Sequence, residues 1–234
     1  MKSESLIEHK QKWHAGIQSE LNFWHRYFTT PGIRNRDQYK NRLDPTEPLQ
    51  PEMIALLPDQ EDVHILDVGA GPLTCLGKVD TTRKRNIHIT AVDPLAIEYN
   101  KILLELDIVP LITTQYCKAE MLVNWFGADY FDMVYCRNAL DHSYDPIIAI
   151  DQMIQVVKPR HYVFLNHHMN EANRNRYGGL HQWNFNRSTA GDFMIQSRDI
   201  SVNISEKYRG RHKITTENMD RHKYGHWVTV KIKK

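Results

Sequence analysis

The sequence predicts an α/β protein built on a mostly parallel central sheet, and three observations predict it. Residues 63–68 form a short apolar run that leads into a turn with two glycines, Gly69 and Gly71. A second apolar run at 87–92 ends in Asp93. From there, segments with helical periodicity alternate with strand-like runs. Such alternation requires parallel strands joined by right-handed crossovers.

The N-terminal segment precedes this pattern and predicts a helical cap. Between residues 6 and 28, apolar side chains recur at steps of three and four, which indicates an amphipathic helix that ends before Pro31. Residues 34–51 are polar and interrupted by prolines, so they predict a loop with a single turn around residues 38–42. We therefore expect a helical cap or lid at residues 1–58 and a core at 59–234, within one compact domain.

The sequence of the core predicts the remaining helices and strands in order along the chain. Helices are expected after the second, third and fourth strands, at residues 94–107, 121–127 and 146–157. The fourth strand is expected to begin at Phe131 and the fifth to include 162–165. After the fifth strand the alternation stops. Strand patterns then predict a closing antiparallel hairpin and one additional strand, at residues 192–197, 200–207 and 226–233.

The glycine turn and Asp93 together predict a nucleoside site. Glycine lets the backbone adopt a positive φ and approach a ligand closely. Asp93 follows Gly71 by 22 residues, at the tip of the neighbouring strand, where its carboxylate can accept both hydroxyls of a ribose. A dinucleotide is disfavoured, because Thr74 stands where a third glycine is needed, Pro72 has no N–H for a pyrophosphate, and Asp67 would repel one. A cationic ligand such as S-adenosylmethionine suits the turn better.

The same segment resembles the class I S-adenosylmethionine-dependent methyltransferases. Their Glu/Asp-x-Gly-x-Gly-x-Gly motif matches Asp67, Gly69 and Gly71, with Leu73 in place of the last glycine. Weaker similarities follow in the family's order between residues 117 and 165. The resemblance implies a Rossmann-like methyltransferase fold, S-adenosylmethionine as cofactor and S-adenosylhomocysteine as product. It also implies that the cofactor is bound by Asp67, Gly69, Ala70, Gly71, Asp93, Pro94, Ala119, Glu120, Cys136, Arg137 and Asn138.

Two further expectations about the cofactor come from the resemblance. Lys118 stands where the family has an acid over the adenine, so Glu120 or backbone groups are expected to take over that role. Many methyltransferases of this fold close the cofactor site with an N-terminal segment, which implies that Tyr39 or Arg42 meets the methionine carboxylate. A helical cap that covers one end of the sheet without contacting the cofactor is the alternative.

The acceptor is expected at the loops after the fourth and fifth strands, 137–146 and 166–187, since ligands of open α/β sheets lie over the carboxyl ends of the strands. The second loop is crowded with polar and aromatic side chains, which either line a polar site or are solvated. The site is favoured, and the residues predicted to contact the acceptor are His168, Arg174, Arg176, Gln182, Trp183 and Asn184.

Transfer of a methyl group to a hydroxyl requires alignment of the acceptor and removal of its proton, for which histidine is the usual base. His142 is the first candidate, with Asp141 as its orienting carboxylate, and His167 and His181 compete for the role. A metal site built from Asp141, His142, His167 or Glu171 is conceivable, since some sugar O-methyltransferases use magnesium, but no compact ligand motif indicates one. The sequence therefore predicts no metal ligands and leaves a metal requirement open.

Composition limits the class of protein and its location. With 234 residues, a net charge of +2 and three scattered cysteines, the chain is expected to be one enzyme domain without a disulfide framework or a Cys-x-x-Cys zinc site. Its apolar runs are shorter than the roughly 18 residues that cross a bilayer, and its polar N-terminus is unlike a signal peptide. A cytoplasmic protein without membrane contact is expected.

The acceptor class is argued by exclusion. Arg137-Asn138-Ala139 differs from the Asn/Asp-Pro-Pro-aromatic motif of enzymes that methylate amide or base nitrogens, and no Pro-Cys pair supplies the nucleophile of a cytosine C5 enzyme. We therefore expect O-methylation of a polar small molecule or glycan, including an anionic one. The run at 180–185 also resembles a feature of bacterial methyltransferases that act in carbohydrate modification. RNA methylation is one alternative, which a cation-rich segment at 207–234 favours and the low net charge disfavours. A non-catalytic S-adenosylmethionine- or nucleotide-binding adaptor is the other.

Overall fold

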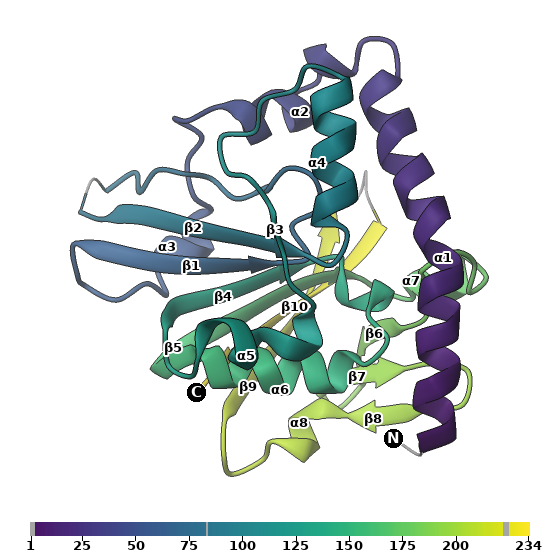
Figure 1. Cartoon of the computed structure of the whole chain (residues 1–234). Coiled ribbons are helices and arrows are strands. Elements are labelled where there is room, and N and C mark those ends of the chain that lie inside the picture. The colour runs from purple at the N-terminus through teal and green to yellow at the C-terminus, as the bar shows by residue number, and fades with distance from the viewer. Residues whose placement is uncertain (1–2, 83, 222–224) are drawn as a thin grey trace.

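The computed structural model describes residues 3–82, 84–221 and 225–234, which build a central sheet covered by helices and a smaller sheet beside it (Figure 1). The central sheet has seven strands in the order β3-β2-β1-β4-β5-β10-β9. Their bounds are β1 Asp62–Val68, β2 Asn86–Asp93, β3 Gln115–Tyr116, β4 Phe131–Arg137, β5 Val157–His168, β9 Lys213–Arg221 and β10 Gly225–Lys233. Strands β1 to β5 pair in parallel, whereas β10 is antiparallel to both β5 and β9. The predicted Rossmann-like fold, with a mostly parallel sheet and a C-terminal antiparallel hairpin, is confirmed.

The middle of the sheet is buried on both faces, so alternate side chains of a strand serve two different cores. In β1, Leu66 and Val68 pack in the cluster that includes α6 Pro146–Val156, whereas Val63 and Ile65 pack on the opposite face. Helices α4 Ala96–Glu105, α5 Leu122–Phe126 and α6 lie where the sequence predicted helices. Helix α6 begins at Pro146 because the preceding side chain, Asp145, accepts the N–H groups of Ile147 and Ile148 at 3.1 and 3.0 Å.

The cap begins with α1 Ser3–Thr29, a long helix that runs along one side of the molecule beside α4 (Figure 1). Its Trp13 and Phe28 pack in one cluster with Tyr99 of α4. The turn expected around residues 38–42 lies within α2 Asp37–Leu43, but this region contains more helix than predicted, with η1 Ile33–Asn35 before α2 and α3 Pro51–Ile54 after it. Tyr39 of α2 is buried in the same cluster, and this tertiary packing stabilises a helix in a polar, proline-interrupted segment.

The C-terminal third differs most from the prediction. The strand predicted at 192–197 is β7 Phe193–Gln196, but it belongs to a separate three-stranded sheet, β6-β7-β8, with β6 Asn184–Arg187 and β8 Ser201–Asn203. The strand predicted at 200–207 ends at Asn203, whose side chain accepts the N–H of Glu206 at 2.9 Å and starts α8 Ile204–Lys207. The closing hairpin is β9–β10, and β9 was not predicted at all.

Short helical turns complete the chain: η2 Ala119–Met121, η3 Leu140–His142 and α7 Glu171–Arg174. Part of the cation-rich segment, residues 222–224, lies outside the described residues. None of the helices in the described part of the chain has the length and hydropathy needed to cross a membrane.

Candidate functional site

A cavity of about 820 Å³ lies at the carboxyl ends of β1, β2 and β4, beneath α1. The ends of these strands and the loops that follow them supply much of its lining. The cofactor-binding residues that the sequence predicted within the core all line this one cavity: Asp67, Gly69, Ala70, Gly71, Asp93, Pro94, Ala119, Glu120, Cys136, Arg137 and Asn138. The predicted binding residues therefore lie together around one cavity.

The turn after β1 is packed too tightly for side chains. Gly69 and Gly71 have φ angles of +70° and +66°, in the left-handed region that favours glycine. A Cβ added at Gly69 would lie 2.3 Å from the Cβ of Ala139, and one at Gly71 would lie 3.1 Å from the indole of Trp24. The backbone of the turn is thus exposed to the cavity between the loop after β4 and the cap.

Two carboxylates at this turn are almost fully buried. Asp93, at the end of β2, is 7% exposed, and it accepts the N–H of Leu95 at 2.9 Å and that of Gly71 at 3.1 Å. Burial raises the pKa of Asp93 to about 7. Asp67 accepts the hydroxyl of Thr74 at 2.6 Å, and burial raises the pKa of Asp67 to about 6. Each carboxylate retains lone pairs beyond these bonds, so Asp93 can still accept hydroxyl donors from a ligand.

Glu120 connects two cavity loops. One of its carboxylate oxygens accepts the backbone N–H groups of Tyr144 and Asp145, both at 3.2 Å, although its side chain also lines the cavity. Burial raises the pKa of Glu120 to about 7. Its neighbour Lys118 lies 5.1 Å from the centre of the Trp13 ring, and this contact joins the turn after β3 to the cap.

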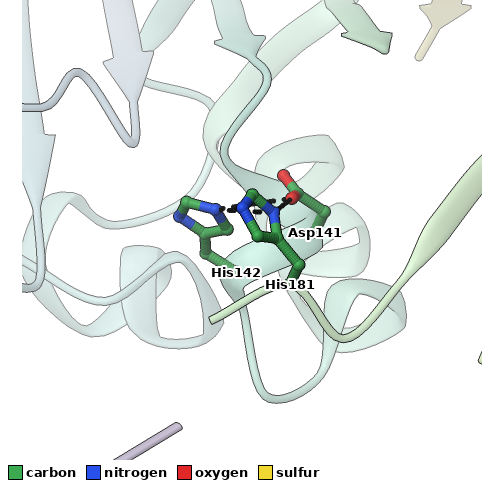
Figure 2. A group of neighbouring side chains, drawn as sticks. All are labelled: Asp141, His142 and His181. Atoms are coloured by element: carbon green, nitrogen blue, oxygen red, sulfur yellow. Dashed lines mark hydrogen bonds and ion pairs between the residues drawn. The ribbon is translucent and has the colours of Figure 1, made fainter. Parts of the chain in front are cut away.

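Asp141, His142 and His181 form a compact group at this cavity, which we call the Asp–His–His cluster (Figure 2). Asp141 Oδ2 lies 2.6 Å from His181 Nδ1 and 3.4 Å from His142 Nε2, and the two ring nitrogens are 3.1 Å apart. Asp141 and His142 belong to η3, directly after β4, whereas His181 follows α7. His142 and His181 line the cavity, and Asp141 is buried behind them.

Charge within the cluster shifts its pKa values in opposite directions. Burial alone would raise the pKa of Asp141, but the imidazoles of His142 and His181 bring it below the ordinary value. Burial alone would lower the pKa of His142, but the carboxylates of Asp141 and Glu20 bring it above the ordinary value. Glu20 reaches His142 from α1, with Oε2 3.9 Å from Nδ1.

His167 lies apart from the other candidate bases. It is part of β5, is fully buried and stacks on Phe185 with 4.5 Å between ring centres. Burial lowers the pKa of His167 to about 4, and neither ring nitrogen has a hydrogen-bond partner among the described residues. His167 does not line the cavity within the described part of the chain.

Of the residues predicted to contact the acceptor, the structure brings only His168 into the lining of the cavity described here. Arg174 is largely exposed and lies 3.9 Å from Glu171, and Arg176 is exposed as well. The remaining three residues are buried and hold the chain in place. Trp183 donates to the carbonyl of Ser143 at 2.9 Å, and the side chain of Asn184 accepts the N–H of Asn173 at 2.9 Å. Gln182 is buried beside Trp183, and its backbone N–H donates to the carbonyl of Asp141 at 2.9 Å.

The sequence predicted a cap or lid from the N-terminal segment, but it did not predict which residues of α1 line the cavity. Glu20 and Trp24 line the cavity, and the indole N–H of Trp24 donates to Glu20 at 2.8 Å. Arg42 of α2 also lines the cavity, lies 5.8 Å from the Trp24 ring centre and donates to the carbonyl of Leu73. Tyr39, the other cap residue expected to reach the cofactor, is buried outside the lining. The available signal was Glu20 itself, an acid on the apolar face of an amphipathic helix.

The fold is Rossmann-like, and the cavity lies over the carboxyl ends of the parallel strands, where ligands of open α/β sheets bind. A family described as a methyltransferase domain matches residues 38–202. The chain belongs to this family and is a class I S-adenosylmethionine-dependent methyltransferase. S-adenosylmethionine is its cofactor. No curated protein sequence is significantly similar to the chain.

Solved structures resemble the fold at low sequence identity. One is 1,6-didemethyltoxoflavin-N1-methyltransferase of Burkholderia thailandensis with bound 1,6-didemethyltoxoflavin and S-adenosylhomocysteine, at 15% identity and a TM-score of 0.49, covering 96% of this chain and 89% of that one. Another is a S-adenosylmethionine-dependent methyltransferase from Methanosarcina mazei, at 17% identity and a TM-score of 0.45, covering 80% of this chain and 98% of that one. A third, from Mesorhizobium loti, has 13% identity and a TM-score of 0.45, covering 79% and 96%.

Proposed function

We propose that the protein methylates a hydroxyl oxygen of a polar small molecule or glycan, with the hydroxyl placed against the Asp–His–His cluster. One observation carries the proposal: His142 and His181 line the same cavity as the residues predicted to bind the cofactor. Methyl transfer requires the donor and the acceptor to be aligned in one space, and a hydroxyl acceptor must lose its proton. A cluster of polar side chains in this cavity can align the hydroxyl and promote the loss of its proton.

The cofactor supplies a methyl group that its sulfonium has already activated. We propose that Asp93 accepts the ribose hydroxyls and that the backbone of residues 69–71 contacts the methionine end. The fit is supported by the absence of room for a Cβ at Gly69 and by the acids that line the cavity. Glu20, Asp67 and Glu120 add negative charge near Asp93, which favours a cationic ligand over one that carries phosphates.

We propose that the acceptor contacts cavity-lining residues from the part of the chain between His142 and His181. His168, Glu171 and Asn175 supply polar groups from the end of β5 and the α7 segment. These groups favour an acceptor with several hydroxyls over an apolar one. An anionic acceptor would meet the cations that line the cavity, among them Lys118 and Arg137, because Arg174 and Arg176 lie outside its lining.

The test is an activity screen with the intact chain. Purified protein is incubated with S-adenosylmethionine and a panel of sugars, hydroxy acids, phenols, amines and RNA, and S-adenosylhomocysteine is quantified. We expect turnover only with hydroxyl acceptors, and mass spectrometry and NMR should locate the new methyl group on oxygen. Methyl transfer to nitrogen or to RNA would contradict the proposal. Cofactor binding without turnover on any acceptor would instead support an adaptor.

Matched variants link the activity to the cavity. Asp93→Ala should raise the cofactor KM, and His181→Gln should lower turnover while cofactor affinity is kept. Asp62→Ala is the control, because Asp62 lies at the amino end of β1, exposed and paired with His88 at 2.8 Å. Activity should be unchanged in this control.

A further inference from the structure

The three polar atoms of the Asp–His–His cluster converge on one point (Figure 2). Asp141 Oδ2, His142 Nε2 and His181 Nδ1 form a triangle with sides of 2.6, 3.1 and 3.4 Å. Ligands with bonds of about 2.1 Å to a common metal ion are about 3.0 Å apart in adjacent octahedral positions and about 3.4 Å apart in a tetrahedron. The triangle therefore has nearly the dimensions of three ligands on one face of a metal ion.

Hydrogen bonds use only part of this triangle. His181 Nδ1 carries either a proton or a lone pair, so it cannot donate to Asp141 and also accept from His142. If Nδ1 donates to Asp141 Oδ2, the 3.1 Å contact with His142 Nε2 is a hydrogen bond only if the same proton is shared between the two acceptors. The other carboxylate oxygen, Asp141 Oδ1, is buried and has no hydrogen-bond partner among the described residues. A metal ion would use one lone pair from each of the three converging atoms.

The surrounding structure holds the three side chains in place. The backbone N–H of Gln182 donates to the carbonyl of Asp141 at 2.9 Å, which ties the segment that carries His181 to η3. Trp183 reinforces the same link through the carbonyl of Ser143. Glu20 lies 3.9 Å from Nδ1 of His142, the nitrogen opposite the one that faces the cluster. Carboxylates behind a ligating histidine orient its ring and increase its basicity.

We propose that Asp141, His142 and His181 bind a divalent first-row transition-metal ion whose remaining coordination positions face the cofactor cavity. Two imidazoles with one carboxylate suit Zn²⁺, Fe²⁺ or Co²⁺, whereas Mg²⁺ and Ca²⁺ prefer sites made of oxygen atoms. The sequence could not indicate this site through a local motif, because His181 follows His142 by 39 residues.

The role of the metal rests on the proposed function. An acceptor hydroxyl at an open position becomes more acidic, and its proton passes to water. The oxygen then bonds to the methyl carbon while the carbon–sulfur bond breaks with its electron pair left on sulfur. The products are the methyl ether and S-adenosylhomocysteine. His142 and His181 serve in this scheme as ligands and not as the base.

The metal is tested first on the wild-type chain, prepared without a polyhistidine tag and freed of metal with a chelator. Co²⁺ is the probe, because its visible absorption reports coordination, and Zn²⁺ is measured by competition. We expect one equivalent of Co²⁺ with a dissociation constant in the micromolar range or below, displaced by Zn²⁺. A wild-type chain that binds neither ion at this level would overturn the proposal.

Variants then locate the site. Asp141→Asn, His142→Gln and His181→Gln should each weaken Co²⁺ binding by about 100-fold or more, since even residues behind the ligands account for about 10–100-fold. His88→Gln is the matched control: His88 stacks on His64 at 4.9 Å and pairs with Asp62 at 2.8 Å, but at the surface. Its Co²⁺ affinity should equal that of the wild type. Equal affinity in all four variants would place the metal elsewhere and overturn the proposal.

Cofactor binding separates the two proposals. Calorimetry with S-adenosylhomocysteine on each variant shows whether the cavity is intact. Co²⁺ binding at the cluster without methyl transfer to any hydroxyl would overturn the proposed function and leave the metal site standing. Methyl transfer by a chain that binds no Co²⁺ and is insensitive to chelator would do the reverse.

Discussion

Gly69 faces Ala139 so closely that a Cβ at Gly69 would lie 2.3 Å from the Cβ of Ala139. The first residue belongs to the turn after β1, and the second immediately precedes η3, which carries Asp141 and His142. The part of the cavity proposed for the cofactor and the part proposed for the acceptor are thus in direct contact. A side chain at Gly69 would push the turn after β1 away from the loop that leads into η3.

The first prediction concerns this contact. Gly69→Ala should lower S-adenosylmethionine affinity by about tenfold or more and should destabilise the fold, because alanine is strained at a φ of +70° by about 1–3 kcal/mol and also meets Ala139. Calorimetry measures the affinity and denaturant unfolding measures the stability. Gly127→Ala is the control, because Gly127 has a φ of +75° and nothing within 4 Å of an added Cβ. Equal cofactor affinity in both variants would refute the role of the contact.

The second prediction concerns Asp93. Asp93→Ala should lower S-adenosylmethionine affinity by one order of magnitude or more, because each charge-assisted hydrogen bond to a ribose hydroxyl contributes about 1.5–3 kcal/mol. The substitution also removes the acceptor for the N–H groups of Gly71 and Leu95, so Asp93→Asn, which keeps an oxygen acceptor, should lose less. Calorimetry on both variants, with Asp62→Ala as control, shows whether Asp93→Ala loses more cofactor affinity than Asp93→Asn. Wild-type affinity in Asp93→Ala would remove Asp93 from the site.

The third prediction is a pH dependence of cofactor binding. Burial raises the pKa of Asp93 and of Glu120 to about 7, so both are partly protonated at neutral pH. A cationic ligand favours the carboxylates, so binding of S-adenosylmethionine should release protons, and affinity should rise from about pH 6 to pH 8. Calorimetry in buffers of different ionisation enthalpy measures the released protons. S-adenosylhomocysteine, which lacks the sulfonium charge, is the control and should release fewer.

The same pKa values set a trend in the stability of the free protein. In the native state Asp93 and Glu120 hold protons that the unfolded chain has already lost above about pH 4. Their contribution to the free energy of unfolding is therefore fully present below the unfolded pKa and is lost as pH rises through about 7. Asp93→Asn should flatten this fall in thermal unfolding measured between pH 5 and pH 8. An unchanged slope would mean that Asp93 is ionised throughout that range.

The frame of the fold could be predicted because its signals are local. The strands β1, β2 and β4 are apolar runs, and the glycines and acids that end them occupy fixed positions along the chain. Elements that are stabilised by residues distant in the sequence could not be predicted in this way. Strand β9 is rich in polar residues and pairs only with β10, so no apolar run marks it. The sequence indicated α2 only as a single turn, because the helix depends on the packing of Tyr39 and Leu43 in the cluster that α1 and α4 share.

The residues of the site also fall into those that local patterns predict and those that depend on the tertiary fold. Asp67 and Asp93 were located from strand ends, and both line the cavity. The convergence of His181 on Asp141 depends on the path of the intervening chain, which composition does not specify. Composition also fails to separate a pocket wall from packing. The run 180–185 combines aromatic and amide side chains, which occur both in pocket walls and in packed interiors. The structure buries Trp183 outside the cavity lining.

The last prediction tests this assignment of Trp183 to packing. Trp183 is 0% exposed, stacks on His9 with 4.5 Å between ring centres and donates to the carbonyl of Ser143. Trp183→Ala should therefore reduce the free energy of unfolding by about 3–5 kcal/mol. Trp125→Ala, at a position 53% exposed, should change it by about 0.5 kcal/mol. Denaturant unfolding measures both.

Trp183→Phe keeps most of the ring and loses the indole N–H, so it should cost about 1 kcal/mol or slightly more and remain folded. In this folded variant the acceptor KM should stay within about twofold of the wild type, because a packing residue acts on stability and not on acceptor binding. A large rise in KM with unchanged stability would return Trp183 to the acceptor site.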